Sequence, residues 1–257
     1  MSVTAPPTVS SYALALGDDA LVLAQRCAEW VTRAPQLEED VALANIGLDL
    51  LGQARALLTY AGHAEGAGRD EDALAYLRDG RDFRNLRIVE QPNEDFAVST
   101  ARLLLFSAYQ HGLYEALTRS TDPTLAAIAA KAVKEVAYHR DHAAGWVLRL
   151  GDGTTTSHER MQAGLDRMWP YVEEMFDASW LHGPGGGLVA TGIAVDPAGL
   201  RPGWDAAVGA ILAEATLEVP SPTQHVHGGR HGVHGDALHA LLAELQQVHR
   251  AHPGAAW

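Results

Sequence analysis

The sequence is poor in cysteine, in basic residues and in long apolar runs. Cys27 is the single cysteine among 257 residues, which excludes an intrachain disulfide framework and a metal cage of several thiolates. Nineteen Lys and Arg stand against 32 Asp and Glu, and the net charge of −13 disfavours nucleic acid and anionic membrane surfaces as general partners. No apolar run approaches the ~18 residues of a transmembrane helix. These absences predict a cytoplasmic protein with no nucleic-acid or membrane partner.

The N-terminal stretch has no basic start followed by an apolar segment, so it does not resemble a secretory signal. Its two adjacent prolines and small polar residues predict a loose tail over residues 1–11. The rest of the chain, with 47% hydrophobic residues overall, supports a sizeable core. Without a repeat or an obvious linker, the sequence predicts a single domain over residues 1–257.

Apolar residues recur at three- and four-residue steps along most of the chain, which predicts an all-α fold of long helices. Asp18 and Asp19 suit the positive start of the first helix, and Pro170 predicts a kink. Asp122 followed by Pro123 is a strong helix-start signal. Residues 88–93 are predicted to be an extended connection. The predicted helices span 18–33, 38–65, 71–78, 94–119, 122–150, 158–177, 202–217 and a last segment after residue 235.

The stretch 43–55 reads as the middle of a long helix with an apolar stripe and a polar stripe. Asn45, Asp49 and Gln53 lie four residues apart and share one face. They indicate either a site inside a helical bundle or a buried hydrogen-bond network that fixes register, and the network is favoured. Gly47 and Gly52 weaken the helix by about 1 kcal/mol each and suit places where a neighbouring helix comes close.

A carboxylate-bridged di-iron site needs a Glu from each of two helices and Glu-x-x-His from each of two others. Glu135 and His139 lie four residues apart, so this spacing fails, and His139 is the one plausible ligand where six are needed. A second histidine cluster occupies residues 225–239, in Gly-rich surroundings that predict a mobile loop rather than a biological metal site. Its members are His225, His227, His231, His234 and His239.

Four arginines lie three residues apart within an acidic protein. They are Arg78, Arg81, Arg84 and Arg87. One interpretation is surface ion pairing with the adjacent aspartates. The other is a small basic edge for a phosphorylated ligand, since arginine binds phosphate through two hydrogen bonds at once.

Several strings resemble the C-subunit family of phenylacetyl-CoA epoxidases, and together they extend over nearly the whole chain. They occupy residues 12–19, 42–55, 89–93, 131–139, 192–197 and 228–257. The resemblance implies a ferritin-like long-helix bundle with additional C-terminal helices and a Gly-rich loop. It also implies a bacterial multicomponent monooxygenase of phenylacetate catabolism, which converts phenylacetyl-CoA to its ring-1,2-epoxide.

In that system the resemblance assigns catalysis to a di-iron A subunit and leaves the C subunit as its structural relative without a cofactor. The two form a heterodimer that assembles further. A B subunit and a reductase carrying FAD and an iron–sulfur cluster complete the complex. The acyl-CoA substrate is bound mainly by the A subunit.

The resemblance also places residues of this chain at the A subunit's ligand positions and near its substrate. The ligand positions fall at Ala20, Leu50, Gln53, Ser107, Val136 and His139, so five of the six ligand types are missing. The residues implied near the acyl-CoA are Asp82, Phe83, Arg84 and Asn85, and, on a weaker match, Gly186, Gly187 and Leu188.

Two alternatives to a structural subunit stay open from the sequence. One is a self-standing di-iron oxygenase with non-standard ligands, which the missing Glu-x-x-His pairs oppose. The other is a helical adaptor protein unrelated to oxygenases.

Overall fold

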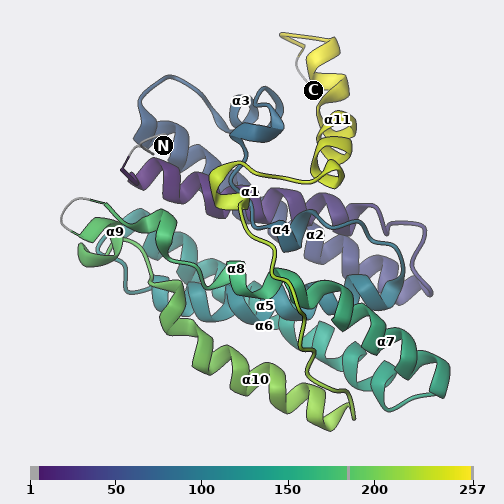
Figure 1. Ribbon diagram of the computed structural model, residues 1–257. Coiled ribbons are helices and arrows are strands. Elements are labelled where there is room, and N and C mark those ends of the chain that lie inside the picture. Colours follow the sequence, from purple (N-terminus) through teal and green to yellow (C-terminus); the bar gives the residue numbers. More distant parts are fainter. Residues whose placement is uncertain (1–5, 184–185, 256–257) are drawn as a thin grey trace. The chain divides into compact units, whose positions relative to one another are not determined.

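The computed structural model describes residues 6–183 and 186–255, and within these ranges the regular elements are helices, with no β-strand (Figure 1). The all-α prediction is therefore confirmed. The chain divides into two compact units. The first holds the residues up to Pro92, Trp180–Ala190 and those from Gly228 onward, and the second holds Asn93–Ser179 and Thr191–His227. The expected single domain stays a prediction.

The first unit is built on a pair of long helices, α1 (Val9–Ala28) and α2 (Leu37–Glu65), which pack along each other. The chain then forms α3 (Glu71–Tyr76), η1 (Gly80–Asp82) and α4 (Arg87–Glu90), of which α3 packs on α2 and α4 on α1. Three later elements join the same unit, so segments far apart in sequence meet here. They are α9 (Gly187–Ala190), η6 (Gly229–His231) and α11 (Asp236–Ala251), and α11 packs on α3 and η1.

The second unit is organised around α5 (Phe96–Leu117), which packs against α6 (Pro123–Gly151), α7 (Thr155–Met168) and α10 (Arg201–Glu214). Shorter helical turns also belong to this unit: η2 (Trp169–Tyr171), α8 (Val172–Met175) and η5 (Pro197–Leu200). In a further turn, η3 (Ser179–Leu181), the chain passes after Ser179 from the second unit to the first. Buried Trp204 fixes α10 on α5 by donating its indole N–H to the Leu105 carbonyl at 2.9 Å.

Several predictions about helix boundaries were wrong, including the end of the first helix, which was expected at residue 33 and lies at Ala28. Helix α1 begins at Val9, because the Thr8 side chain caps it, so the expected tail over residues 1–11 ends at least three residues sooner. Residues 87–90 form the short helix α4 rather than an extended connection. Pro170 does not kink a continuing helix: α7 ends at Met168 and a 3₁₀ turn follows. The Asp122 cap of α6 is confirmed, with its carboxylate accepting from two backbone N–H groups.

The polar stripe of α2 runs from the surface into the core rather than forming one buried network. Asn45 is exposed, Asp49 is half-buried and Gln53 is buried. Of the two helix glycines, Gly47 meets the expectation of close packing, since a Cβ there would touch Cys27 and the Ala24 carbonyl. Gly52 does not, because no heavy atom lies within 4 Å of such a Cβ.

Helix α2 is also, in the described ranges, the one helix whose length and apolar composition would allow it to cross a membrane. The core helix of a soluble protein satisfies the same two criteria. The expectation of no membrane partner stays a prediction.

Candidate functional site

The four arginines of the segment Arg78–Arg87, here named the arginine segment, fall into two structural pairs. Arg78 is buried and donates from Nη1 to Asp18 Oδ2 at 3.0 Å, and Arg87 donates from Nε to Glu90 Oε1 at 2.7 Å. Both therefore pair with buried carboxylates, and the expected pairing with the adjacent aspartates is wrong for them. Arg81 is exposed, Arg84 is half-buried, and neither forms an ion pair within the described residues. The predicted basic edge therefore consists of Arg81 and Arg84 alone.

Arg84 uses its guanidinium to fold back on its own chain. Its Nη1 donates to the carbonyls of Arg81 and Phe83, each at 2.7 Å. Carbonyls leave the positive charge uncompensated, so Arg84 holds a fixed cation at the edge of an acidic protein. That is the arrangement with which a phosphate or a carboxylate is recognised.

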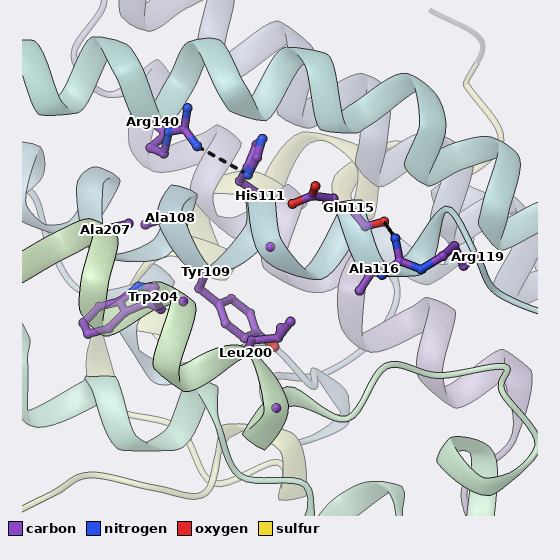
Figure 2. A pocket seen from close by; sticks show the side chains of 13 residues that line it. Ala108, Tyr109, His111, Glu115, Ala116, Arg119, Arg140, Leu200, Trp204 and Ala207 are labelled. Carbon is purple, nitrogen blue, oxygen red and sulfur yellow. Dashed lines mark hydrogen bonds between the residues drawn. The ribbon is translucent and has the colours of Figure 1, made fainter.

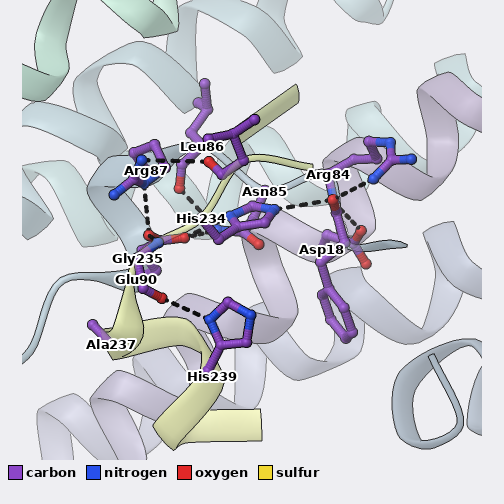
Figure 3. Close-up of polar contacts among 12 residues, drawn as sticks. Asp18, Arg84, Asn85, Leu86, Arg87, Glu90, His234, Gly235, Ala237 and His239 are labelled. Carbon is purple, nitrogen blue, oxygen red and sulfur yellow. Dashed lines mark hydrogen bonds and ion pairs between the residues drawn. The ribbon is translucent and has the colours of Figure 1, made fainter. Parts of the chain in front are cut away.

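Buried side chains hold the backbone that carries Arg84. The Arg84 N–H donates to Asp18 Oδ2 at 2.8 Å and the Leu86 N–H donates to Asp19 Oδ1 at 2.7 Å. The Arg84 carbonyl accepts from Arg230 Nη1 at 2.7 Å. Figure 3 shows Asp18 beside Arg84, at the end of a polar cluster that runs through Asn85 to Glu90. Groups of helix α1 and of the C-terminal region therefore fix this stretch from both sides.

Asp18 and Asp19 consequently do not start a helix, as the sequence suggested, but lie buried in the middle of α1. Asp19 accepts two hydrogen bonds from Arg230, at 3.1 Å from Nη1 and 2.6 Å from Nη2. Burial raises the pKa of Asp19 to about 6, against the opposing effects of Arg230 and the Leu86 N–H. The carboxylate is thus ionised in most molecules at neutral pH, with a narrow margin.

Glu90 is the second anchor of the arginine segment. Its Oε1 accepts from Arg87 and, at 2.9 Å, from the Gly235 N–H, while Oε2 accepts from Asn85 Nδ2 at 3.2 Å and faces His234 Nδ1 at 2.7 Å (Figure 3). Burial is the largest single influence and raises the pKa of Glu90. The hydrogen bonds from His234 and Gly235, with the charges of His234 and Arg87, outweigh it, so the pKa is lowered overall.

His234 joins the C-terminal loop to this anchor. Its side chain is fully buried; Nδ1 faces the Glu90 carboxylate and Nε2 faces the Phe83 carbonyl at 3.0 Å. Because a carboxylate and a carbonyl only accept hydrogen bonds, both contacts are satisfied by the doubly protonated imidazolium. Residues 229–235 are therefore packed into the first unit, whereas the sequence predicted a mobile loop.

We expect Glu90→Gln to lower the free energy of unfolding by about 3 kcal/mol at pH 7, because it leaves His234 and Arg87 without a buried counter-charge. The native pKa lies below the ordinary value of 4.5, so the carboxylate stabilises the fold above pH 4.5 and loses that effect as the pH falls through the native value. In urea titrations, the difference in the free energy of unfolding between variant and wild type should therefore become smaller below pH 4.5. Glu94→Gln, in an exposed ion pair with Arg167, is the control. A difference in unfolding free energy that does not change with pH would show that the ionised Glu90 carboxylate is not the stabilising group.

The second unit contains a half-open pocket of about 400 Å³ between α5, α6, η5 and α10. Figure 2 shows Arg140, His111, Glu115 and Arg119 along one side of it, with Tyr109, Leu200 and Trp204 along the other. Burial, then the charge of Arg140, lowers the pKa of His111, so the neutral ring can accept from Arg140 Nη1, 3.4 Å from its Nδ1. The pocket has room for a small ligand, but its mixed charges select no class of ligand.

None of the sequence-based predictions pointed to this pocket. The available signal was a four-residue repeat of small residues on its walls, which leaves the space open. The repeat comprises Ala108, Gly112 and Ala116 on α5, and Gly199, Gly203 and Ala207 on η5 and α10.

Comparison with known proteins supplies what the geometry alone cannot. The sequence model of a family described as "Phenylacetic acid catabolic protein" matches residues 1–257. The chain is also 48% identical over 249 residues to the C subunit of 1,2-phenylacetyl-CoA epoxidase from Escherichia coli (strain K12), covering 97% of this chain and 99% of that protein. The chain belongs to the phenylacetic acid catabolic protein family. This family has a ferritin-like helical fold, which agrees with the predicted fold class.

For the residues that the resemblance places near an acyl-CoA, the structure gives positions but no ligand. Phe83 and Asn85 are fully buried, and Phe83 packs under the Arg78 guanidinium, 4.2 Å from its ring centroid. Asp82 is exposed and Arg84 is half-buried at the same edge. Gly186, Gly187 and Leu188 lie at α9 of the same unit, with Leu188 buried. Their role in substrate binding stays a prediction for this family member.

The six positions implied to match iron ligands are all buried. Ala20, Leu50 and Gln53 lie in α1 and α2 of the first unit, and Ser107, Val136 and His139 lie in α5 and α6 of the second. Alanine, leucine and valine have no donor atom for a metal, so this set does not fit a di-iron centre. In the part of the chain that the structure describes, no group of three or more His, Cys, Asp or Glu is placed to hold a metal ion.

Proposed function

We propose that this chain is the structural, non-catalytic C subunit of a phenylacetyl-CoA epoxidase. The observation that carries the proposal is the 48% identity to a subunit of that name over nearly the full length of both chains. In this proposal the chain carries no cofactor. It forms a heterodimer with a di-iron A subunit that assembles further, together with a B subunit and a reductase holding FAD and an iron–sulfur cluster. The complex acts in the cytoplasm, in aerobic phenylacetate catabolism.

The packing at the ligand positions supports a stabilising role without catalysis. Leu50 and Val136 have no exposed surface, so hydrocarbon fills the places that the resemblance gives to ligands. Burying carboxylates there without a metal would cost several kcal/mol each. Apolar residues in place of the carboxylate ligands keep the bundle stable without a metal. This is what we expect of a subunit that stabilises a catalytic relative.

The test is iron content and turnover of the chain purified alone and then co-expressed with its catalytic partner. We expect the chain alone to contain no stoichiometric iron and to epoxidise no phenylacetyl-CoA. We expect the co-expressed pair to contain iron and, with the reductase present, to epoxidise phenylacetyl-CoA. Stoichiometric iron in the isolated chain would overturn the proposal in favour of a self-standing oxygenase. A catalytic partner whose stability and activity do not depend on this chain would favour an unrelated helical adaptor.

Arg84 is the residue of this chain that we expect to affect substrate affinity. Arg84→Ala should raise the KM of the assembled complex for phenylacetyl-CoA about fivefold with little change in kcat, the effect of losing one partly exposed contact to phosphate worth ~1 kcal/mol. Arg33→Ala removes an exposed arginine from the same unit and should leave KM unchanged. The measurement is steady-state kinetics at fixed ionic strength. Equal KM values for the two variants would show that Arg84 does not contact the substrate.

A further inference from the structure

Helix α2 carries a second apolar stripe, opposite the one that packs on α1. Its members are Leu37, Val41, Ala44, Leu48 and Leu51, followed by Arg55. They are spaced alternately by four and three residues, which is the a/d pattern of a coiled-coil seam. Leu37, Val41 and Leu48 are 73%, 54% and 64% exposed, while Ala44 and Leu51 are half-buried. We name these five apolar residues the α2 seam.

The α2 seam is long enough and open enough to receive another helix. From Leu37 to Leu51 it extends about 21 Å at 1.5 Å per residue. Beyond it α2 packs on α3, and Arg55 pairs with Glu71 of α3 at 3.6 Å. Gly52 lies beside the seam, and no heavy atom is within 4 Å of a Cβ built there, so a partner backbone could approach closely. A regular apolar seam of this length on a water-exposed helix is atypical of an isolated monomer.

We propose that the α2 seam is the docking surface for a helix of the catalytic A subunit. This inference rests on the proposed function, in which the chain acts within a multisubunit epoxidase. Two copies of a chain with a net charge of −13 repel each other, which disfavours a homodimer across this face. Glu38 and Asp40 flank the seam at its start. The occupant is therefore a helix with an apolar a/d stripe and with basic side chains where it meets these acids.

The experiment compares two substitutions that each place an acid at an exposed apolar position. Leu48→Asp lies in the seam, and Val248→Asp, at a position 55% exposed on α11, is the matched control. Tagged wild type and both variants are co-expressed with the catalytic A subunit, and complex formation is measured by affinity recovery and by light scattering after gel filtration. We expect Leu48→Asp to weaken binding at least tenfold and Val248→Asp to leave it unchanged. Leu37→Asp serves as a second seam variant, with circular dichroism confirming that each variant folds.

The outcomes separate the two proposals. If the wild-type chain recovers no A subunit, the proposed function fails, whatever the seam does. If the wild type and the seam variants all bind equally, the docking surface is wrong and the proposed function stands. If the wild type alone is a dimer that Leu48→Asp makes monomeric, the occupant is a second copy. If the wild-type chain alone floats with phosphatidylcholine vesicles and Leu48→Asp abolishes this flotation, the occupant is lipid. Either result overturns the inference.

Discussion

Leu50→Glu is expected to lower the free energy of unfolding by about 4 kcal/mol or more, without creating iron binding or oxygenase activity. Leu50 has no exposed surface and lies between Ile46 and Ala54, which are also buried. A glutamate there restores a ligand type at a position that the resemblance matches to iron, but its buried neighbours one turn away on α2, Ile46 and Ala54, are apolar. Because four of the other five matched positions still lack the ligand type, no metal is held there to balance the new carboxylate, which therefore destabilises the fold.

Leu48→Glu is the matched control, since it places the same side chain on the same helix at a position 64% exposed. Its effect on unfolding should stay within about 0.5 kcal/mol, the usual range for surface substitutions. Urea titrations followed by circular dichroism compare the two variants, and metal analysis checks for iron. Equal stabilities for Leu50→Glu and wild type would show that Leu50 is not buried in solution, and iron in the variant would show that the site can still assemble.

Local patterns in the sequence predicted much of the helical fold. The range of α2 was predicted within one residue at its start, because an apolar stripe runs to a glycine that ends the helix. The start of α6 followed from an aspartate cap with proline in the first turn. Each of these signals lies within a few residues of the feature that it specifies, and the resemblance supplied the fold class.

The candidate site was much less predictable, since its partners are distant in sequence. Asp18 pairs with Arg78, 60 residues away, and Asp19 with Arg230, 211 residues away. Two adjacent acids have the same local pattern whether they begin a helix or lie buried opposite arginines, so the first helix was predicted to start nine residues too late. In the sequence His234 is one of several loop histidines, and its partner Glu90 lies 144 residues away. Long-range ion pairs leave no local periodicity to detect.

Arg230→Met is expected to destabilise the protein by about 3–5 kcal/mol at neutral pH, the usual cost of removing one partner from a buried ion pair. Arg230 is buried, and its guanidinium binds the Asp19 carboxylate, the Ala15 carbonyl and the Arg84 carbonyl. Methionine keeps much of the hydrophobic bulk but leaves Asp19 with the Leu86 N–H. Arg167→Met, which removes an exposed pair with Glu94, should cost less than about 1 kcal/mol.

The cost of Arg230→Met should also depend on pH in a direction that the Asp19 pKa fixes. Burial raises that pKa from 3.8 to about 6 even with Arg230 present, and losing the arginine raises it further. The folded variant then holds a proton that the unfolded chain releases above pH 3.8, so the variant becomes relatively more stable as the pH falls from 8 towards 5. Urea titrations across this range measure the effect, and a destabilisation that does not change with pH would contradict it.

A double variant separates the charge of Asp19 from the positioning of Arg84. Asp19→Asn combined with Arg230→Met removes the unpaired carboxylate and should recover part of the lost stability. It does not restore the donor to the Arg84 carbonyl, so the backbone that carries the uncompensated arginine stays less constrained. If Arg84 contacts the acyl-CoA as proposed, the double variant should raise the KM of the assembled complex for phenylacetyl-CoA even where its stability is largely recovered. If both the stability and the wild-type KM are recovered, the role of Arg230 is limited to balancing the charge of Asp19.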